Sequence, residues 1–240
     1  MPTPVIVIPA AGHATRLQPI TVSKEMLPVQ ERPLIEHLVE RLSVVGPARI
    51  RVVTRPEKTD LREHAALRGW EVVLGHPEHV AASLLLGFEG LADDEIVLVG
   101  FPDTLIDAPD AAARVLSALV GDADADVALG LFHTAEPWRG DVVTLVTDET
   151  ADGHGGVRYV SGVVPKPTGP TDPARDLVWG LLAGRIGPLR ALADVAEPGA
   201  LWDRWARQGT GRVCAAVLPG RYRDLGTRES LAEWGINLQQ

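Results

Sequence analysis

The first half of the chain alternates between short apolar runs and stretches with helical spacing. Val5–Ile8 is β-branched throughout, which is typical of a buried strand. Further strands are predicted at Ile50–Val53, Val72–Leu74 and Glu95–Val99. Helices are predicted over Pro33–Leu42, Leu61–Leu67 and Val80–Phe88. Strands that alternate with helices predict a parallel sheet with right-handed crossovers.

The second half has a looser pattern. Strands are predicted at Asp126–Phe132, Asp141–Val146 and Val213–Leu218. Helices are predicted over Leu189–Val195, Leu201–Gln208 and Glu229–Trp234. After Gly155 the chain is rich in proline and glycine turns, and Pro165–Asp176 is its most loop-like part. The sequence contains no internal repeat, so we expect one domain over residues 1–240.

Composition narrows the function without defining it. The 240 residues are 45% hydrophobic and 23% charged, which is ordinary for a soluble globular protein with a real core. A formal net charge of −9 argues against a nucleic-acid surface but allows a small anion held by local cations. Cys214 is the only cysteine, which excludes an intrachain disulfide and a cysteine zinc cluster. The N-terminal apolar run is too short for a signal peptide or membrane span, so we expect a cytoplasmic protein without a membrane partner.

The segment that follows the first strand carries the strongest chemical signal. Open parallel sheets bind ligands at the carboxyl ends of their strands, and Ala10–Thr15 leaves the first strand there. Its small residues allow backbone N–H groups to approach a phosphate. Arg16 can hold two phosphate oxygens, and Lys24 supplies a mobile charge. Composition alone favours a plain turn with two solvated cations, since neither a Walker loop nor a G-x-G-x-x-G fingerprint is present.

The order of the residues changes that balance. Residues 8–42 read IPAAGHATRLQPITVSKEMLPVQERPLIEHLVERL. This stretch resembles the signature of sugar-1-phosphate nucleotidylyltransferases, and its Lys-Glu-Met-Leu-Pro wording is most similar to the bacterial glucose-1-phosphate uridylyltransferases. The thymidylyltransferases have a similar pattern. The resemblance implies an α/β, Rossmann-like nucleotidyltransferase fold, with a mixed, mostly parallel sheet flanked by helices.

Three later segments fit the same family. LVGFPDTLID and GRYRDLGTRESL resemble the two stretches that carry its Mg²⁺ ligands, which implies Asp103 and Asp224 as metal ligands. In VVPKPTGP, Lys166 stands where the family has a lysine that contacts the sugar phosphate. Gly140 and Gly180 fit the glycines that line the sugar, and Trp179 is the aromatic residue expected beside it.

The resemblance implies a reaction. A nucleoside monophosphate would pass from a nucleoside triphosphate, UTP or dTTP favoured, to a sugar 1-phosphate or sugar-like phosphate, with release of pyrophosphate and formation of a nucleotide-sugar. Arg16 would hold the β- and γ-phosphates, and Lys24 would neutralise charge on the same oxygens. The expected nucleotide-binding residues are Ala10, Ala11, Gly12, His13, Ala14, Thr15 and His76. Residues 1–125 would form a nucleotide-binding half and residues 126–240 a sugar-phosphate-binding half, and a homo-oligomer is compatible with this.

Several positions depart from the family pattern. Ala14 stands where glycine is usual, and a positive φ would be costly for alanine. Pro165 replaces a glutamate that binds sugar hydroxyls, which favours an unusual sugar or a cyclitol. The spacing from Pro19 to Lys24 is shorter than in the thymidylyltransferases. In VVLGHPEHVAAS, His76 could replace the usual base-binding glutamine and His79 a glycine, although a solvated loop fits equally well.

Two alternatives stay open at this point. One is a relative that binds a nucleotide or nucleotide-sugar without turnover, which the departures at Ala14 and Pro165 favour. The other is a cytidylyltransferase for a non-sugar phosphate such as phosphocholine. Retention of both candidate metal aspartates together with Arg16, Lys24 and Lys166 favours the catalytic interpretation, because paired carboxylates hold like charges together at a cost unless a cation is present.

Overall fold

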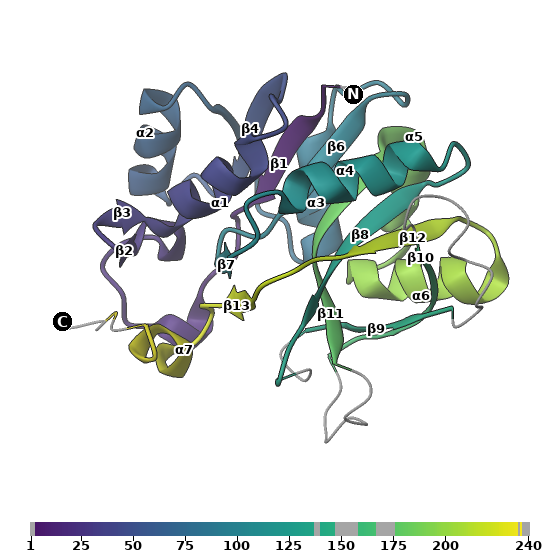
Figure 1. Cartoon of the computed structure of the whole chain (residues 1–240). Helices are drawn as coiled ribbons and strands as arrows, with labels where there is room; N and C mark the ends of the chain where they lie inside the picture. Colours follow the sequence, from purple (N-terminus) through teal and green to yellow (C-terminus); the bar gives the residue numbers. More distant parts are fainter. Residues whose placement is uncertain (1–2, 137–139, 147–157, 167–175, 235, 237–240) are drawn as a thin grey trace.

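A computed structural model of the chain describes residues 3–136, 140–146, 158–166, 176–234 and 236. The strands of the main sheet are β1 (Val5–Pro9), β4 (Arg49–Thr54), β5 (Glu71–Leu74), β6 (Ile96–Gly100), β8 (Val127–His133), β9 (Val142–Leu145), β10 (Arg158–Val164), β11 (Leu177–Arg185) and β12 (Val213–Val217). Within the described ranges they form a 9-stranded sheet in the order β5-β4-β1-β6-β11-β8-β12-β10-β9 (Figure 1).

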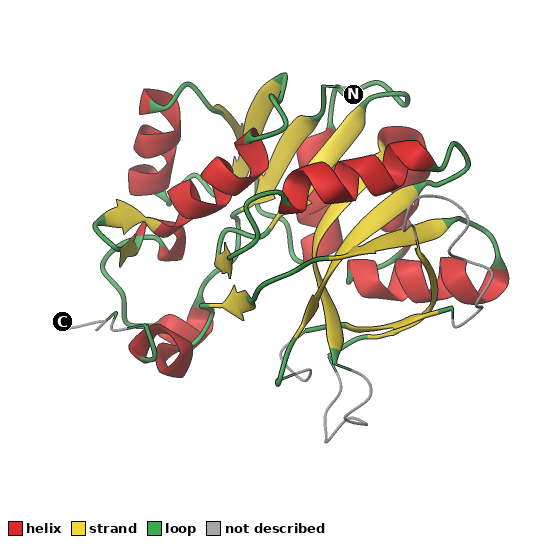
Figure 2. Cartoon of the chain, in the orientation of Figure 1, coloured by secondary structure: helices red, strands yellow, loops and turns green. Residues whose placement is uncertain are grey.

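Helices cover both faces of this sheet (Figure 2). The α-helices are α1 (Leu34–Ser43), α2 (Thr59–Leu67), α3 (Val80–Phe88), α4 (Ala111–Gly121), α5 (Ile186–Leu189), α6 (Pro198–Gln208) and α7 (Arg228–Ala232). Short 3₁₀ helices are η1 (Thr15–Leu17), η2 (Lys24–Met26) and η5 (Arg190–Asp194). The predicted α/β class is therefore confirmed.

The two faces of β1 belong to two separate hydrophobic clusters. Ile6 and Ile8 pack into the cluster that includes α1, α2 and α4. Val5 and Val7 point the other way, into the cluster built by α3, α5 and α6. Because successive side chains of a strand alternate between faces, a strand buried on both sides is apolar at every position. The result is a layered structure whose central sheet is shielded from water by helices on each side.

The two halves of the sheet differ in strand direction. β5, β4, β1 and β6 run parallel to one another, as the alternating pattern predicts. Beyond β6 the sheet is mixed: β11 is antiparallel to both β6 and β8, β12 is parallel to β8, and β10 is antiparallel to β12 and β9. The mixed sheet is thus confirmed, with its parallel pairings concentrated in the first half.

Three of the larger elements were not predicted from the hydrophobic pattern. They are the strands β10 and β11 and the helix α4. β11 reads LVWGLLAGR and is buried along most of its length, so it shows no alternation and carries two glycines that suggest a turn. Its place beside β6 makes it the strand that joins the two halves of the sheet.

Two small two-stranded sheets lie outside the main sheet. β2 (Pro28–Val29) pairs with β3 (Arg32–Pro33), and β7 (Thr104–Ile106) pairs with β13 (Tyr222–Asp224). A third apolar cluster ties α7 to the segment around η1 and η2, as Figure 1 shows at the lower left, where α7 lies against the purple loop. None of the described helices is long and apolar enough to cross a membrane.

Candidate active site

The carboxyl ends of four parallel strands meet at one edge of the sheet and form a cavity there. The segments that follow β1, β4, β5 and β6 supply most of its wall, as the rule for open α/β sheets predicts. The cavity has a volume of about 410 Å³. Its lining includes the predicted nucleotide-binding residues Ala11, Gly12, His13 and Thr15, with Lys24 and Asp103.

Two cationic side chains, those of Arg55 and Lys58, hold the loop after β1 through its backbone carbonyl groups. Arg55 donates through Nε to the Ala11 carbonyl at 2.6 Å, and Lys58 donates through Nζ to the Ala10 carbonyl at 2.7 Å. Ala10 therefore belongs to the support of the loop and is not part of the cavity lining. Ala14 does adopt the left-handed conformation, with φ 52°, and lines an adjoining cavity. The backbone at Ala14 is therefore strained in a way that a glycine at this position would avoid.

Lys24 and Asp103 form the central ion pair of the site. Lys24 Nζ lies 2.8 Å from Asp103 Oδ2, and their side chains are 14% and 20% exposed. Burial by itself would lower the pKa of Lys24, but the charges of Asp103 and Glu25 outweigh it and raise that pKa. Lys24 therefore stays a cation in this partly desolvated place.

The β7–β13 ribbon brings the two predicted metal aspartates together. Asp224 pairs with Thr104, the residue after Asp103, and the Leu225 N–H donates to the Asp103 carbonyl at 2.7 Å. A Cβ placed on Gly226 would lie 2.7 Å from Asp224 Oδ1, 3.0 Å from Arg16 Nη2 and 3.4 Å from Asp103 Oδ2. The guanidinium of Arg16 and both carboxylates therefore converge around one glycine.

The two carboxylates have opposite pKa shifts. Burial disfavours the charged form of Asp103, but the Lys24 ammonium overrides it and lowers the pKa of Asp103. Burial and the negative charge of Asp103 together raise the pKa of Asp224. A cation between them would relieve this repulsion, so the donor set suits Mg²⁺, a hard cation that takes one or two protein carboxylates and fills its other positions with water and phosphate. No group of three acidic, histidine or cysteine side chains that could hold a metal occurs among the described residues.

A second cavity, of about 250 Å³, adjoins the first. Four residues line both of them: Val80, Phe101, Asp103 and Glu197. The second cavity gathers the predicted acceptor residues Gly140, Lys166 and Trp179 beside Arg16 and Asp224. The predicted donor and acceptor residues thus line two chambers that meet at Asp103.

Asp141 holds the wall of the second cavity together through two hydrogen bonds. Its carboxylate accepts a hydrogen bond from the Lys166 backbone N–H at 3.2 Å and one from Trp179 Nε1 at 3.1 Å. The side chain is buried, and a Cβ on Gly199 at the start of α6 would collide with its carboxylate. Lys166 itself has φ 24°. One buried carboxylate therefore places both the lysine backbone and the indole of the cavity wall.

Aromatic rings form a continuous row that begins in the cavity wall. Trp179 meets Phe101 edge to face, with ring centroids 5.5 Å apart. On its other side Trp179 meets Trp202 at 6.3 Å, and Trp202 meets Trp205 at 5.6 Å. Trp202 is fully buried, so the row runs from the cavity into the core between β11 and α6.

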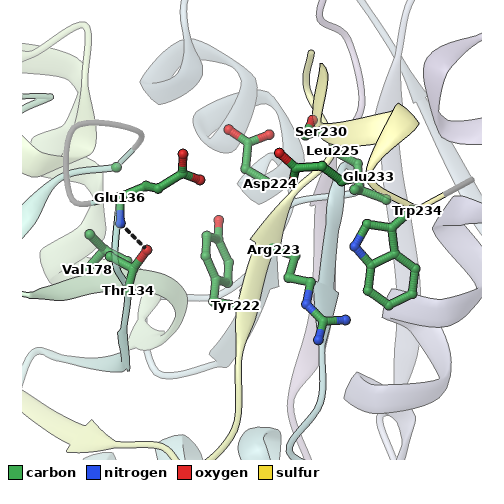
Figure 3. Close-up of a pocket in the computed structure, with 11 residues that line it drawn as sticks. Thr134, Glu136, Val178, Tyr222, Arg223, Asp224, Leu225, Ser230, Glu233 and Trp234 are labelled. Atoms are coloured by element: carbon green, nitrogen blue, oxygen red, sulfur yellow. Dashed lines mark hydrogen bonds between the residues drawn. The ribbon is translucent and has the colours of Figure 1, made fainter. Parts of the chain in front are cut away.

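Figure 3 shows a third pocket, which adjoins the second cavity along β13. Tyr222 and Asp224 point toward the side where Glu136 lies, while Arg223 points to Trp234, with its Cζ 4.3 Å from the ring centroid. The Glu136 backbone N–H donates to Thr134 Oγ1 at 3.0 Å. Gly140, Tyr222 and Asp224 line this pocket and the second cavity alike, so strand β13 borders both.

Besides Ala10, two predicted residues lie outside the lining of the cavities. Gly180 is packed against the ring of Tyr222, with which any Cβ would collide. His76 contacts Arg55, with Nδ1 3.1 Å from Nη1, and it is His79 that lines the first cavity. His79 Nδ1 also accepts from the Ala82 N–H at the start of α3.

Sequence reasoning missed the residues that support the site. These are Glu25, Arg55, Lys58, Asp60, Asp141 and Glu197. Arg55 had a usable signal, because it follows the second strand at the ligand edge. Asp141 stands next to a glycine that the family resemblance selected. The roles of the others depend on long-range contacts that spacing does not reveal.

The mixed sheet, the small-residue loop after β1 and the paired aspartates define the class of nucleotidyltransferase-fold proteins. Residues 6–155 match the family model of the MobA-like NTP transferase domain, which is more than half of the chain, so the chain belongs to this family. The resemblance to sugar-1-phosphate nucleotidylyltransferases is confirmed by its relatives.

Those relatives match in part of their length. The bifunctional protein GlmU of Rhodospirillum rubrum is 29% identical over 136 residues, which are 55% of this chain and 29% of the relative. The glucose-1-phosphate thymidylyltransferase of Neisseria meningitidis is 32% identical over 102 residues, 39% of this chain and 35% of the relative. The UTP–glucose-1-phosphate uridylyltransferase of Pseudomonas aeruginosa is 45% identical over 58 residues, 23% of this chain and 21% of the relative. The matched segments thus span about a fifth to a third of these relatives.

Solved structures confirm the fold over nearly the whole chain. A UDP-glucose pyrophosphorylase complexed with UDP-glucose superposes with a TM-score of 0.78, covering 97% of this chain and 97% of that one at 21% identity. An apo UDP-glucose pyrophosphorylase superposes with a TM-score of 0.77 at 19% identity, covering 97% and 96% of the two chains.

Proposed function

We propose that the protein transfers a nucleoside monophosphate from a nucleoside triphosphate to a sugar 1-phosphate or sugar-like phosphate, releasing pyrophosphate. One observation carries the proposal: Arg16, Lys24, Asp103, Lys166 and Asp224 come from distant segments and line two adjoining cavities that share Asp103. Two cavities are what a reaction between two phosphate substrates requires. The named activities of the relatives support the same reaction class.

The reaction brings two polyanions together. An oxygen of the acceptor phosphate forms a bond to the α-phosphorus of the donor, and the bond from that phosphorus to the bridging oxygen of the pyrophosphate breaks. The acceptor oxygen is already anionic, so the step needs no strong general base. The protein's task is to orient the two phosphates and to offset their charge.

The donor cavity supplies cations and backbone donors. Gly12, His13 and Thr15 border the space for the triphosphate, with Lys24 at its inner end. Arg16, beside both aspartates, would hold phosphate oxygens of the departing pyrophosphate as a planar two-point donor. Lys24 would balance charge on the same group while remaining within reach of Asp103.

Asp103 and Asp224 would hold Mg²⁺, which supplies charge neutralisation between the two phosphates when bound. Their carboxylates fit the ion because they are close together and partly buried, and burial together with the charge of Asp103 raises the pKa of Asp224. The pairing of β7 with β13 brings them together, since Asp224 ends β13 and Asp103 immediately precedes β7.

The acceptor cavity is lined by two cations, Arg16 and Lys166, and by four carboxylates, those of Asp103, Asp141, Glu197 and Asp224. Lys166 would bind the acceptor phosphate. Glu197, at the start of α6, supplies a carboxylate to this cavity, whereas Pro165 cannot accept a hydrogen bond through its side chain. Glu197 would therefore take acceptor hydroxyls in this protein.

The test is pyrophosphate release in the presence of Mg²⁺. We would combine each common nucleoside triphosphate with a panel of sugar, cyclitol and choline phosphates. Release with one sugar or cyclitol phosphate, abolished by EDTA, is the expected result. Release only with choline phosphate, or nucleotide binding without release from any pair, would contradict the proposal. An Arg16→Ala variant is the control that separates the enzyme's activity from a contaminant's.

A further inference from the structure

The segment that carries Lys24 is tied on both sides to the start of α2. On one side, Asp60 accepts two hydrogen bonds from Ser23: one from the backbone N–H at 2.7 Å and one from the hydroxyl at 2.6 Å. On the other side, Glu25 accepts two from Lys58 Nζ, at 2.8 and 2.9 Å. The residues immediately before and after Lys24 are thus both anchored.

The anchor at Glu25 is buried. The Glu25 side chain is 1% exposed and that of Lys58 is 12% exposed. Lys58 Nζ also donates to the Ala10 carbonyl at 2.7 Å, so one ammonium joins the phosphate loop to the Lys24 segment. Breaking a buried pair leaves an uncompensated charge, which makes this link a strong one.

The anchor at Asp60 is an ionised carboxylate. Burial would raise its pKa, but the hydrogen bonds from Ser23 and from the Leu61 N–H more than compensate and lower the pKa of Asp60. Bonds from neutral donors to a carboxylate are stronger than bonds between neutral groups. Ser23 is therefore held firmly at neutral pH.

From this geometry we infer that Lys58 and Asp60 are positioning residues for Lys24. They hold its backbone, while its ammonium stays free to reach Asp103 or a phosphate. The two flanking anchors leave rotation about the Lys24 side-chain bonds as its means of moving between those partners. This inference rests on the proposed function, since it assigns a catalytic purpose to the Lys24 position. It also explains how a shortened connection after Pro19 can still deliver a lysine to the site.

The test uses Asp60→Ala, with Glu63→Gln as the matched control because Glu63 is an exposed carboxylate on the same helix. The first readout is hydrogen exchange, which needs no substrate. In Asp60→Ala the amides of residues 20–26 should exchange at least about tenfold faster, because the Ser23 N–H loses its acceptor. Glu63→Gln should leave their exchange unchanged. Unchanged exchange in Asp60→Ala would overturn the inference.

The second readout is a double-mutant cycle on turnover. Asp60→Ala should lower kcat by about tenfold to a hundredfold, because a small misplacement of a phosphate-binding group is costly. In a Lys24→Ala background the same substitution should change the residual kcat by less than about twofold, since the residue it positions is gone. Equal losses in both backgrounds would overturn the inference by showing a role elsewhere.

The two readouts distinguish a failure of this inference from a failure of the proposed function. If the unaltered protein releases no pyrophosphate with any substrate pair, the proposed function fails, and with it the catalytic purpose assigned here. Hydrogen exchange still decides whether Asp60 holds this segment.

Discussion

Lys24 and Lys166 line adjoining cavities, yet the protein positions them by different means. Lys24 has its ammonium on Asp103 and anchored residues on either side. Lys166 is held through its backbone N–H by Asp141, and among the described residues its ammonium has no ion-pair partner. Lys24 is therefore part of a preformed charge network, whereas the described contacts of Lys166 place its backbone.

The difference teaches how charge is distributed across the site. On the donor side, carboxylates offset the cations before any substrate is present, which keeps a cluster of basic groups stable when no triphosphate is bound. On the acceptor side, a single buried carboxylate sets the geometry of the wall and contributes little to the charge that faces the ligand. We expect damage to the donor side to affect both stability and turnover, and damage to the acceptor side to affect mainly acceptor binding.

The largest effect should come from the carboxylate that both cavities share. In Asp103→Asn, kcat should fall by about 1,000-fold, because the charge that pairs with Lys24, and that would help to hold Mg²⁺ in the proposed reaction, is lost. The measurement is steady-state pyrophosphate release. Asp107→Asn, four residues away and exposed, should stay within about twofold of the unaltered protein. Similar losses of kcat in the two variants would contradict a special role for the carboxylate that both cavities share.

The donor network should also be visible in stability. Lys58→Met strands the buried Glu25 carboxylate, so the free energy of unfolding should drop by about 3 kcal/mol or more. Urea unfolding followed by circular dichroism measures this. Arg207→Met removes an exposed pair on α6 and should cost only about 0.5 kcal/mol. A loss in Lys58→Met no greater than in Arg207→Met would mean that the network is not a stabilising unit.

The acceptor side should respond in binding. Asp141→Asn keeps the size of the side chain but loses one of its two acceptor oxygens, so either Lys166 or Trp179 loses its partner. The KM for the acceptor should rise about tenfold, with the KM for the nucleoside triphosphate unchanged. A rise in both KM values would show that the two sides are not separable.

The smallest effect is expected when the folded protein is treated with a thiol reagent, because Cys214 lies in β12 away from both cavities. Burial is the main cause that raises the pKa of its thiol to about 12. Because a raised pKa keeps the thiol protonated, almost no thiolate exists at neutral pH, and a thiol reagent should not react with the folded protein. Reaction in the native state would indicate opening of β12. Labelling thus provides a control that reports global unfolding for the variants above.

The residues of the site that stand in local motifs could be predicted from the sequence, whereas those that depend on long-range contacts could not. Arg16, Lys24, Asp103 and Asp224 stand in local motifs whose order carries the family's signature, and the structure brings these four together. The packing of Gly180 against the ring of Tyr222 could not be predicted, because it is a contact between strands far apart in the chain. The pairing of Lys58 with Glu25 and of Asp60 with Ser23 could not be predicted, since it depends on where α2 packs.

The fold shows a parallel limit. The helix–strand alternation of the first half follows hydrophobic spacing, and the structure confirms it. β11 was missed because a strand buried on both faces loses the alternation that reveals a strand. The residues of that strand nevertheless build the acceptor wall, through Trp179. Where a segment is buried on all sides, burial has removed the periodic signal by which its structure is recognised.

The row of rings from Phe101 through Trp179 and Trp202 to Trp205 gives the protein a built-in optical sensor. Trp179 lines the acceptor cavity, so an occupant changes the polarity around its indole, while the deeper rings, shielded from solvent, keep a constant environment. Tryptophan emission therefore contains a cavity-facing contribution from Trp179 and buried contributions from Trp202 and Trp205, besides those of the three other tryptophans of the chain. Titration of an acceptor phosphate can be followed by fluorescence in the unlabelled protein, before any nucleotide is added and without any chemistry taking place.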